Sequence, residues 1–287
     1  MTATGYALCT GLNSVDPGHY SGWSGPLTAC EFDANDMARL LSRRGFQVTT
    51  LLTAAAKRGV VLGKLRELAS LAKPGDLVAF TNSSHGGQLP DLNADEDDGA
   101  DETLCMFDGE LVDDELFHAL GAFAAGVRVL IVSDSCHSGT VARMMHTESM
   151  LPGLTHASRA LPPDVALATY HANGDFYDAI LSRPELREAK GNLKASVMLI
   201  SGCQDNQTSL DGTYNGLFTG TLLKVWNAGT FTGNYRTFRN RIVSRMPPDQ
   251  TPNLFWASDR CAKFEAQVPF TIGTKLDLAS VRGVVTL

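Results

Sequence analysis

The chain has 287 residues, of which 44% are hydrophobic and 19% are charged, and its formal net charge is −7. These values suit one large α/β domain with an ample core, and the negative charge argues against nucleic acid as the main partner. No apolar run approaches the roughly 18 residues of a membrane span, and no signal-like segment precedes the first expected strand, so we expect a cytoplasmic protein without membrane contact. Six cysteines are spread singly without CxxC pairs, which favours a reducing compartment over a disulfide framework or a zinc site.

Apolar strands alternate with amphipathic helices along much of the chain. We expect strands at 5–12, 46–52, from 76 towards His85, and 127–132, and helices at 27–44, 54–72 and from 113 onward. Further along we expect a strand at 194–201, helices at 217–226 and 235–246, and an edge strand at 252–257. This alternation predicts an α/β fold in which a mostly parallel central sheet carries helices on both faces.

Residues 141–194 interrupt this alternation. They contain several prolines, and only a modest helical stretch is expected, at about 172–181. A long segment of this kind is usually functional or mobile rather than a simple connector. We therefore expect a single domain over 1–287, in which an insertion at 141–194 separates a larger part (1–140) from a smaller one (195–287).

Two of the expected strands end in polar loops that carry reactive side chains. The apolar run 127–132 is followed by Ser133-Asp-Ser-Cys-His-Ser-Gly139, which holds Cys136. The run that begins at Asp76 leads to His85 and two glycines. Open α/β sheets keep their active sites beyond the carboxyl ends of the strands, so Cys136 and His85 are both expected there.

Cys136 and His85 together suit nucleophilic catalysis. A free thiol titrates near 8.5 and only the thiolate attacks, so a nucleophilic cysteine needs a base. His85 precedes Cys136 by 51 residues, close to the roughly 50-residue separation found in caspases. The N–H groups of Gly86 and Cys136 could stabilise an oxyanion. His137 is a competing base, but adjacent strand residues point to opposite faces, which favours His85.

The two loops resemble the motifs of a known family. Ser83-Ser-His-Gly-Gly-Gln88 together with Asp134-Ser-Cys-His-Ser-Gly139 is similar to the motifs of metacaspases and their prokaryotic relatives, the orthocaspases, which are caspase-like cysteine peptidases. Family members usually have Ser-Gly-His-Gly in the first motif, so Ser84 replaces a glycine. Similar segments run from about residue 6 to residue 257. The resemblance implies a caspase-like three-layer sandwich, a monomer, and catalysis by Cys136 and His85.

The resemblance also implies an acidic pocket for the substrate residue before the scissile bond, the P1 residue. It assigns this S1 pocket to Cys30, Asp33, Ser83 and Asp134. The segment 27–33 is similar to the family's Leu-x-Gly-Cys-x-Asn-Asp motif, although its third and sixth residues differ. Two carboxylates in a partly dry pocket select Arg or Lys, and bidentate geometry favours Arg. Protein or peptide substrates with a basic P1 residue are therefore expected.

An acidic stretch raises the question of a metal. An EF-hand-like spacing of Asp91, Asn93, Asp95 and Glu102 is incomplete, because Glu96 stands where that loop needs glycine. The resemblance implies a different calcium site at Asp101, Asp113 and Asp114, with its fourth carboxylate replaced at about Arg143. The alternative is a solvated acidic loop whose aspartates begin a helix. No cofactor is expected to be required, and calcium dependence is open.

The expected function is a cysteine endopeptidase that cleaves after Arg or Lys. In caspase-like enzymes the region of the 141–194 segment is cut, and this segment holds six basic residues where such an enzyme could cleave itself: Arg143, Arg159, Arg183, Arg187, Lys190 and Lys194. The alternative for this segment is an ordinary surface insertion with ordinary charges. The alternatives for the function are a catalytically silent caspase-like scaffold and a zymogen that needs an upstream activator. No G-x-S-x-G elbow, P-loop or dinucleotide fingerprint occurs, which argues against other α/β enzymes.

Overall fold

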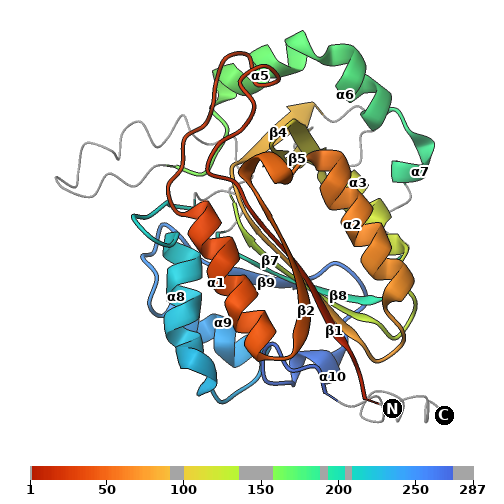
Figure 1. Cartoon of the computed structure of the whole chain (residues 1–287), viewed down its shortest axis with the longest axis vertical. Helices are drawn as coiled ribbons and strands as arrows, with labels where there is room; N and C mark the ends of the chain where they lie inside the picture. Colours follow the sequence, from red (N-terminus) through yellow and green to blue (C-terminus); the bar gives the residue numbers. More distant parts are fainter. Residues whose placement is uncertain (1, 91–99, 136–157, 188–192, 204–208, 274–287) are drawn as a thin grey trace.

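A six-stranded sheet forms the centre of the molecule. The computed structural model describes residues 2–90, 100–135, 158–187, 193–203 and 209–273 (Figure 1). The sheet has the strand order β2-β1-β3-β7-β8-β9. Its strands are β1 (Gly5–Gly11), β2 (Phe46–Leu52), β3 (Leu77–Ser83), β7 (Arg128–Asp134), β8 (Ser196–Ser201) and β9 (Asn253–Trp256). All neighbours are parallel except β8 and β9, so the expected α/β fold and its edge strand are confirmed.

Helices cover both faces of this sheet. One face carries α1 (Cys30–Arg43), α8 (Leu217–Trp226) and α9 (Tyr235–Val243), and the other carries α2 (Arg58–Leu71) and α3 (Asp113–Gly121). On the first face Met37, Leu222 and Phe238 share one core cluster with residues of the sheet. On the second face Leu65 and Leu120 belong to a separate cluster. Each helix turns its apolar stripe, spaced by three or four residues, towards the strands.

The parallel register aligns the carboxyl ends of the strands at one edge. Ser83 pairs with Gly11 of β1 on one side and with Asp134 of β7 on the other. Ser133 in turn pairs with Ser201 at the end of β8. The loops that follow these strands are therefore neighbours, which is the arrangement that parallel sheets use for active sites.

A second, smaller sheet follows β3 and was not expected from the sequence. It is antiparallel and consists of β4 (Gly86–Pro90), β5 (Ala100–Met106) and β6 (Gly109–Val112), in that order. Glycine, proline and acidic residues are poor strand formers, so local preference indicated a loop here. The strands form because β5 pairs on both of its sides, with β4 and with β6.

Helices also occur in the segment 141–194, which was expected to be mostly irregular. The structure contains α5 (Pro163–Ala172), α6 (Gly174–Leu181) and the short α7 (Pro184–Arg187). Pro163 and Pro184 stand at the first helical position, where the missing N–H costs nothing, so these prolines begin helices instead of preventing them. In Figure 1, α5 and α6 pass over the end of the molecule that holds β4 and β5.

Short elements complete the described chain. They are two 3₁₀ turns, η1 (Thr53–Ala55) and η2 (Asn227–Gly229), and the final α10 (Ala262–Glu265). Among the helices of the described residues, none has the length and apolar character that crossing a bilayer would take.

Candidate active site

His85 lies two residues beyond the end of β3, where its ring is fixed from two sides. Its Nε2 lies 3.0 Å from the carbonyl oxygen of Gly25, and the ring of Trp23 packs against it with 4.7 Å between centroids. A carbonyl can only accept, so Nε2 must carry the proton and Nδ1 is left with the lone pair. Nδ1 is buried and has no hydrogen-bond partner among the described residues. It is thus the ring nitrogen able to accept a proton.

Burial keeps this ring neutral. Desolvation lowers the pKa of His85 to about 4, against the opposing effect of the Gly25 carbonyl, and the positive charge of Arg159 contributes to the decrease. At neutral pH the imidazole is therefore in its basic form. A histidine held in this state is suited to take a proton from a nearby acid.

Cys136 and His137 lie outside the described residues, two and three positions after the end of β7. Four of the other cysteines, Cys9, Cys30, Cys105 and Cys203, are buried. Burial raises the pKa of both Cys9 and Cys30 to about 12, and it raises that of Cys105 as well. These three thiols stay protonated at neutral pH and are poor nucleophiles.

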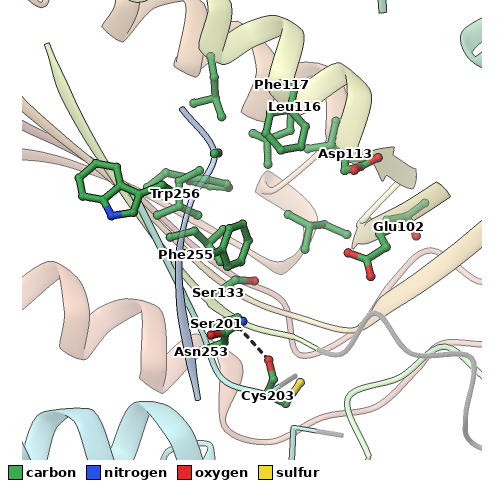
Figure 2. Close-up of a pocket in the computed structure, with 18 residues that line it drawn as sticks. Glu102, Asp113, Leu116, Phe117, Ser133, Ser201, Cys203, Asn253, Phe255 and Trp256 are labelled. Atoms are coloured by element: carbon green, nitrogen blue, oxygen red, sulfur yellow. Dashed lines mark hydrogen bonds between the residues drawn. The ribbon is translucent and has the colours of Figure 1, made fainter. Parts of the chain in front are cut away.

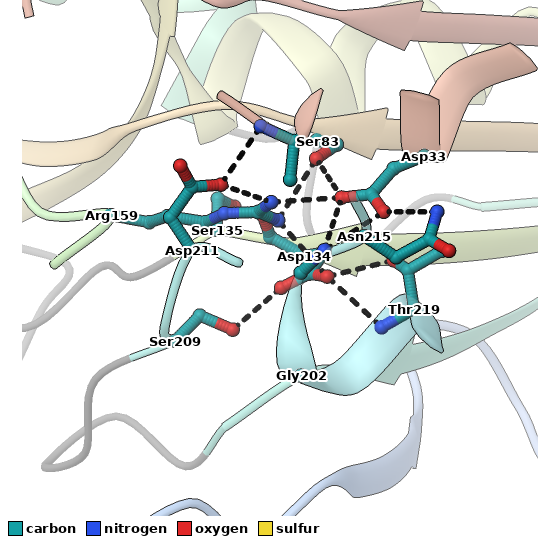
Figure 3. A network of polar contacts seen from close by, with 12 residues as sticks. Asp33, Ser83, Asp134, Ser135, Arg159, Gly202, Ser209, Asp211, Asn215 and Thr219 are labelled. Carbon is teal, nitrogen blue, oxygen red and sulfur yellow. Dashed lines mark hydrogen bonds and ion pairs between the residues drawn. The ribbon is translucent and has the colours of Figure 1, made fainter. Parts of the chain in front are cut away.

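A buried pocket of acidic residues lies beside His85, and the side chain of Arg159 fills it (Figure 3). The guanidinium Nη2 is 2.8 Å from a carboxylate oxygen of Asp33 on α1, and Nη1 is 3.0 Å from one of Asp134 on β7. Nη1 also donates to the hydroxyl of Ser83 at 2.9 Å. The thiol of Cys30 interacts with that same hydroxyl. The four residues assigned to this pocket from the sequence thus lie together, and their role towards substrate stays a prediction.

Asp211 adds a third carboxylate that sequence reasoning missed. It accepts a hydrogen bond from Nη2 of Arg159 at 2.9 Å. The backbone N–H groups of Thr28 and Ala29 donate to its two oxygens at 2.7 and 3.2 Å. Asp211 therefore joins the loop before α8 to the start of α1. The sequence offers only a weak signal for it, an Asp-Gly pair in a polar loop.

The amino end of α8 points at the same carboxylates. The N–H of Gly216 donates to Asp33 at 3.0 Å, and the N–H and hydroxyl of Thr219 donate to Asp134 at 3.1 and 2.7 Å. Ser209 adds a further hydroxyl bond to Asp134, at 2.7 Å. Free N–H groups and the helix dipole favour negative charge here.

The pocket carries more negative than positive charge. Three aspartates surround one guanidinium, which leaves a formal excess of two negative charges in a buried space. Burial raises the pKa of Asp33 to about 6 against the attraction of Arg159, and repulsion from Asp134 adds to the rise. An environment of this kind strongly favours a bound cation over a neutral or negative side chain.

The backbone around Arg159 is extended and bonded on both sides. Its N–H donates to the carbonyl of Ser209 at 3.1 Å, within an antiparallel bridge between Ser158 and Leu210. Its carbonyl accepts from the N–H of Gly86 at 3.0 Å. This N–H belongs to the residue that follows His85, and it is one of the two oxyanion donors expected from the sequence.

Three further acidic residues gather at the second sheet. One carboxylate oxygen from each of Asp101, Asp113 and Asp114 lies within 4.8 Å of the other two, and Asp101 and Asp114 are buried. Asp101 is on β5 and the other two begin α3. Hard oxygen ligands in such proximity fit a calcium ion, so the residues present match the site that the motifs implied. Arg143 and the residues 91–99 lie outside the described residues.

A separate cavity of about 510 Å³ lies between α3 and β9 (Figure 2). Leu116 and Phe117 line one side and Phe255 another, while Cys203 lies towards the sheet edge. Apolar side chains make up most of its lining, and Glu102 and Asp113 add carboxylates at one end.

The caspase-domain family model matches residues 14–270. The chain belongs to the caspase-domain family. Metacaspase-1 of Schizosaccharomyces pombe is 32% identical to this caspase-domain chain over 249 residues, which cover 75% of it and 57% of the relative. Metacaspase-1A of Aspergillus oryzae is 31% identical and matches 77% of the chain and 59% of the relative. The chain thus spans less than two thirds of these curated relatives, and the resemblance to metacaspases is confirmed.

Solved structures agree with this assignment. The crystal structure of a protein from Geobacter sulfurreducens is 52% identical, with a TM-score of 0.84, and the match covers 94% of this chain and 99% of the other. Caspase-1 from Spodoptera frugiperda has a TM-score of 0.51 at 13% identity, covering 90% of this chain and 88% of the other. The latter likeness concerns the fold alone, and it confirms the expected caspase-like sandwich.

Proposed function

We propose that this caspase-domain protein is a cysteine endopeptidase that cleaves peptide bonds after Arg and, more weakly, after Lys. The observation that carries the proposal is a fully buried guanidinium held by three carboxylates next to the neutral His85 and the N–H of Gly86. The metacaspase names of the relatives support the same chemistry. The proposal assigns Cys136 as the nucleophile and His85 as the base.

The reaction would proceed by general-base catalysis. Nδ1 of His85 takes the proton of the Cys136 thiol, and the thiolate attacks the carbonyl carbon of the P1 residue. The N–H groups of Gly86 and Cys136 donate to the oxyanion; one such donor is typically worth about 10²–10³ in turnover. The protonated imidazole then gives its proton to the leaving amine. Water, deprotonated by the same ring, hydrolyses the thioester.

Selectivity for Arg follows from the number of donors that the pocket can satisfy. The guanidinium of Arg159 reaches Asp33, Asp134 and Asp211 at once and also donates to Ser83. A lysine ammonium is a single point with three donors and cannot span all of these oxygens. An aspartate would meet only negative charge and is therefore excluded.

The test is hydrolysis of fluorogenic peptides that end in Arg, Lys or Asp, with wild type and Cys136→Ala. We expect release after Arg, weaker release after Lys, none after Asp, and none from the variant. Release that persists in Cys136→Ala would refute the nucleophile. Release after Asp in preference to Arg would refute the pocket.

We further propose that calcium binds at Asp101, Asp113 and Asp114. A bound Ca²⁺ would supply positive charge that relieves the repulsion among three close carboxylates. The strand β5 that carries Asp101 also pairs with the active-site segment, since the N–H of Cys105 donates to the carbonyl of His85 at 2.9 Å. Holding β5 against α3 would therefore stiffen the segment that presents the base.

Thermal unfolding in the presence of CaCl₂ or MgCl₂ tests this site. We expect calcium to raise the Tm of wild type and not that of Asp113→Asn, because the variant lacks one of the three ligands. Asp113 is chosen because it is the least buried of the three. Asp175→Asn, at an exposed position on α6, is the matched control and should respond like wild type. An equal calcium response in all three proteins would refute the site.

Self-processing within 141–194 is also part of the proposal. A protease binds its substrate in extended form, because main-chain hydrogen bonds to the site require it. Arg187 ends α7, and Arg183 lies between α6 and α7. Their helical surroundings argue against both as cleavage sites. Arg143 and Lys190 lie outside the described residues, and Lys194 is an exposed residue just before β8. Arg159 is in extended backbone and is already in contact with the proposed catalytic groups.

A further inference from the structure

Residues 158–161 pass through the proposed active site and form an isolated β-bridge on each side. On one side, Arg159 N–H donates to Ser209 and Ser158 bridges Leu210 in antiparallel fashion. On the other side, Gly86 N–H donates to the Arg159 carbonyl, and the N–H of Leu161 donates back to the Gly86 carbonyl at 2.7 Å. This is the main-chain pairing that a peptide adopts when it adds a strand to a binding site.

The side chain of Arg159 leaves no room for a second cation in the acidic pocket. Arg159 is completely buried. A Cβ on Gly216 would lie 2.5 to 2.6 Å from three atoms of its guanidinium, so the pocket wall is in close contact with the group. Every substrate with a basic P1 residue would therefore have to displace Arg159 first.

The carbonyl of Arg159 makes one of the contacts that the proposed mechanism requires of a scissile carbonyl. It accepts its hydrogen bond from Gly86 N–H, the donor proposed for the oxyanion, and this donor directly follows His85 in the chain. The side chain and the carbonyl of Arg159 thus both contact groups that, in the proposed mechanism, bind the P1 residue of a substrate. A structural ion pair alone would not require the second of these contacts.

We propose that residues 158–161 are an internal substrate: Arg159 closes the pocket of the intact chain to other substrates, and Arg159–Ala160 is the bond that the enzyme cleaves in its own chain. This inference rests on the proposed function and concerns the regulation of the same site. A covalently tethered occupant has a high effective concentration, so external peptides compete poorly until the tether is cut.

The cleavage is an ordinary hydrolysis. The Cys136 thiolate adds to the carbonyl carbon of Arg159, the bond to the Ala160 nitrogen breaks, and His85 protonates that nitrogen. Water then converts the thioester to the carboxylate of Arg159 and regenerates the thiol. No oxidant, reductant or nucleotide takes part.

The segment after the bond is anchored in the fold. Ala160 and Leu161 are buried, and Leu161 packs with Val15 and Tyr20. After cleavage the fragment that begins at Ala160 should therefore remain attached to the rest of the domain. A second reason is that β7 of the first fragment pairs with β8 of the second in the central sheet. The new terminus at Arg159 loses its tether and can leave the pocket.

Mapping the cleavage site is the first test. Wild type and Cys136→Ala are incubated in parallel, and the products are analysed by intact mass and N-terminal sequencing. We expect wild type to yield fragments 1–159 and 160–287, the second beginning Ala-Leu-Pro-Pro, and Cys136→Ala to stay intact. Cleavage at another basic residue with Arg159–Ala160 intact, or a fully active chain that stays uncut, would overturn the proposal.

Binding of agmatine, which carries the side chain of arginine, tests the closed pocket without any catalysis. Titration calorimetry compares intact Cys136→Ala with Cys136→Ala/Arg159→Gln. We expect the second protein to bind about tenfold more tightly or better, because its pocket is not self-occupied. Adding Gly216→Ala should abolish that binding, and Cys136→Ala/Arg183→Gln is the control that should bind like Cys136→Ala.

The outcomes separate this proposal from the proposed function. Equal binding to both proteins would overturn the closed pocket and leave the specificity for Arg standing, whereas binding to neither would overturn both. Circular dichroism checks that Arg159→Gln folds. The cleavage map needs no Arg159 variant and decides the scissile bond in either case.

Discussion

Gly216→Ala is the sharpest test of how the pocket recognises a cation. The backbone of Gly216 has φ −57° and ψ 154°, which alanine adopts without strain. The added methyl, however, would lie 2.5 Å from Nη2 and 2.6 Å from Cζ and Nη1 of Arg159. These atoms are in contact with three carboxylates, so the guanidinium has to withdraw and its hydrogen bonds lengthen or break.

The cost can be worked out from the bonds that the guanidinium makes. Charge-assisted hydrogen bonds contribute about 1.5–3 kcal/mol each, so the loss of one or two of those to Asp33 and Asp211 costs about 3 kcal/mol. This corresponds to a decrease of about 100-fold in kcat/KM for peptides ending in Arg. A lysine ammonium is narrower and needs less space, so the preference for Arg over Lys should fall.

The assay compares kcat/KM for Arg and Lys peptides in wild type, Gly216→Ala and Gly121→Ala. Gly121 ends α3, and a Cβ there would meet nothing within 4 Å, so this control should keep wild-type kinetics. If Gly216→Ala cleaves after Arg as fast as wild type with an unchanged ratio of Arg to Lys, substrates do not bind in the way Arg159 does, and the reasoning fails.

Three further predictions concern charges in and near the site. Asp211→Asn removes one of three carboxylates and should lower kcat/KM for Arg peptides about tenfold, with Asp175→Asn as the control. Unchanged kinetics would show that Asp211 does not contribute to binding of the P1 side chain. In Arg159→Gln the pKa of His85 should rise from about 4 towards its usual value, because a positive charge is lost and water enters; a histidine titration by NMR that shows no rise would contradict this. Burial raises the pKa of Glu110 to about 7, so its contribution to stability is present below its unfolded pKa of 4.5 and is lost as pH rises through 7. This loss amounts to about 3 kcal/mol for a shift of this size, and Glu110→Gln should abolish it. Urea unfolding at pH 5 and pH 8.5 measures the loss in wild type and variant. The same loss in both proteins would show that Glu110 is not its source.

Local patterns in the sequence were sufficient for the elements of the central sheet. The strand at 46–52 and the helix at 217–226 have the expected bounds, since both are carried by apolar residues at the spacing of their own structure. The helical stretch expected at about 172–181 corresponds to α6. The second sheet and the helices α5 and α7 were missed, because acidic, glycine and proline residues mask their tendency to form strands or helices.

The same contrast holds for the candidate site. His85 and Asp134 could be assigned from the sequence because each follows an apolar strand, and parallel strands bring their carboxyl ends to one edge. Gly25 and Trp23, which orient the imidazole, come from a loop without periodicity. Nothing in the residues near them indicates that they meet a histidine about 60 positions away.

Only the tertiary structure decided what occupies the pocket. Arg159 meets Asp33 across 126 positions of sequence and Asp211 across 52. The sequence by itself determined the fold, the family and the sheet edge at which chemistry is expected, because these depend on periodic burial and on short motifs. The pairing of Arg159 with three aspartates depends on where α1, the end of β7 and two loops converge. A buried charge of this kind is specified by its distant partners and not by its neighbours in the chain.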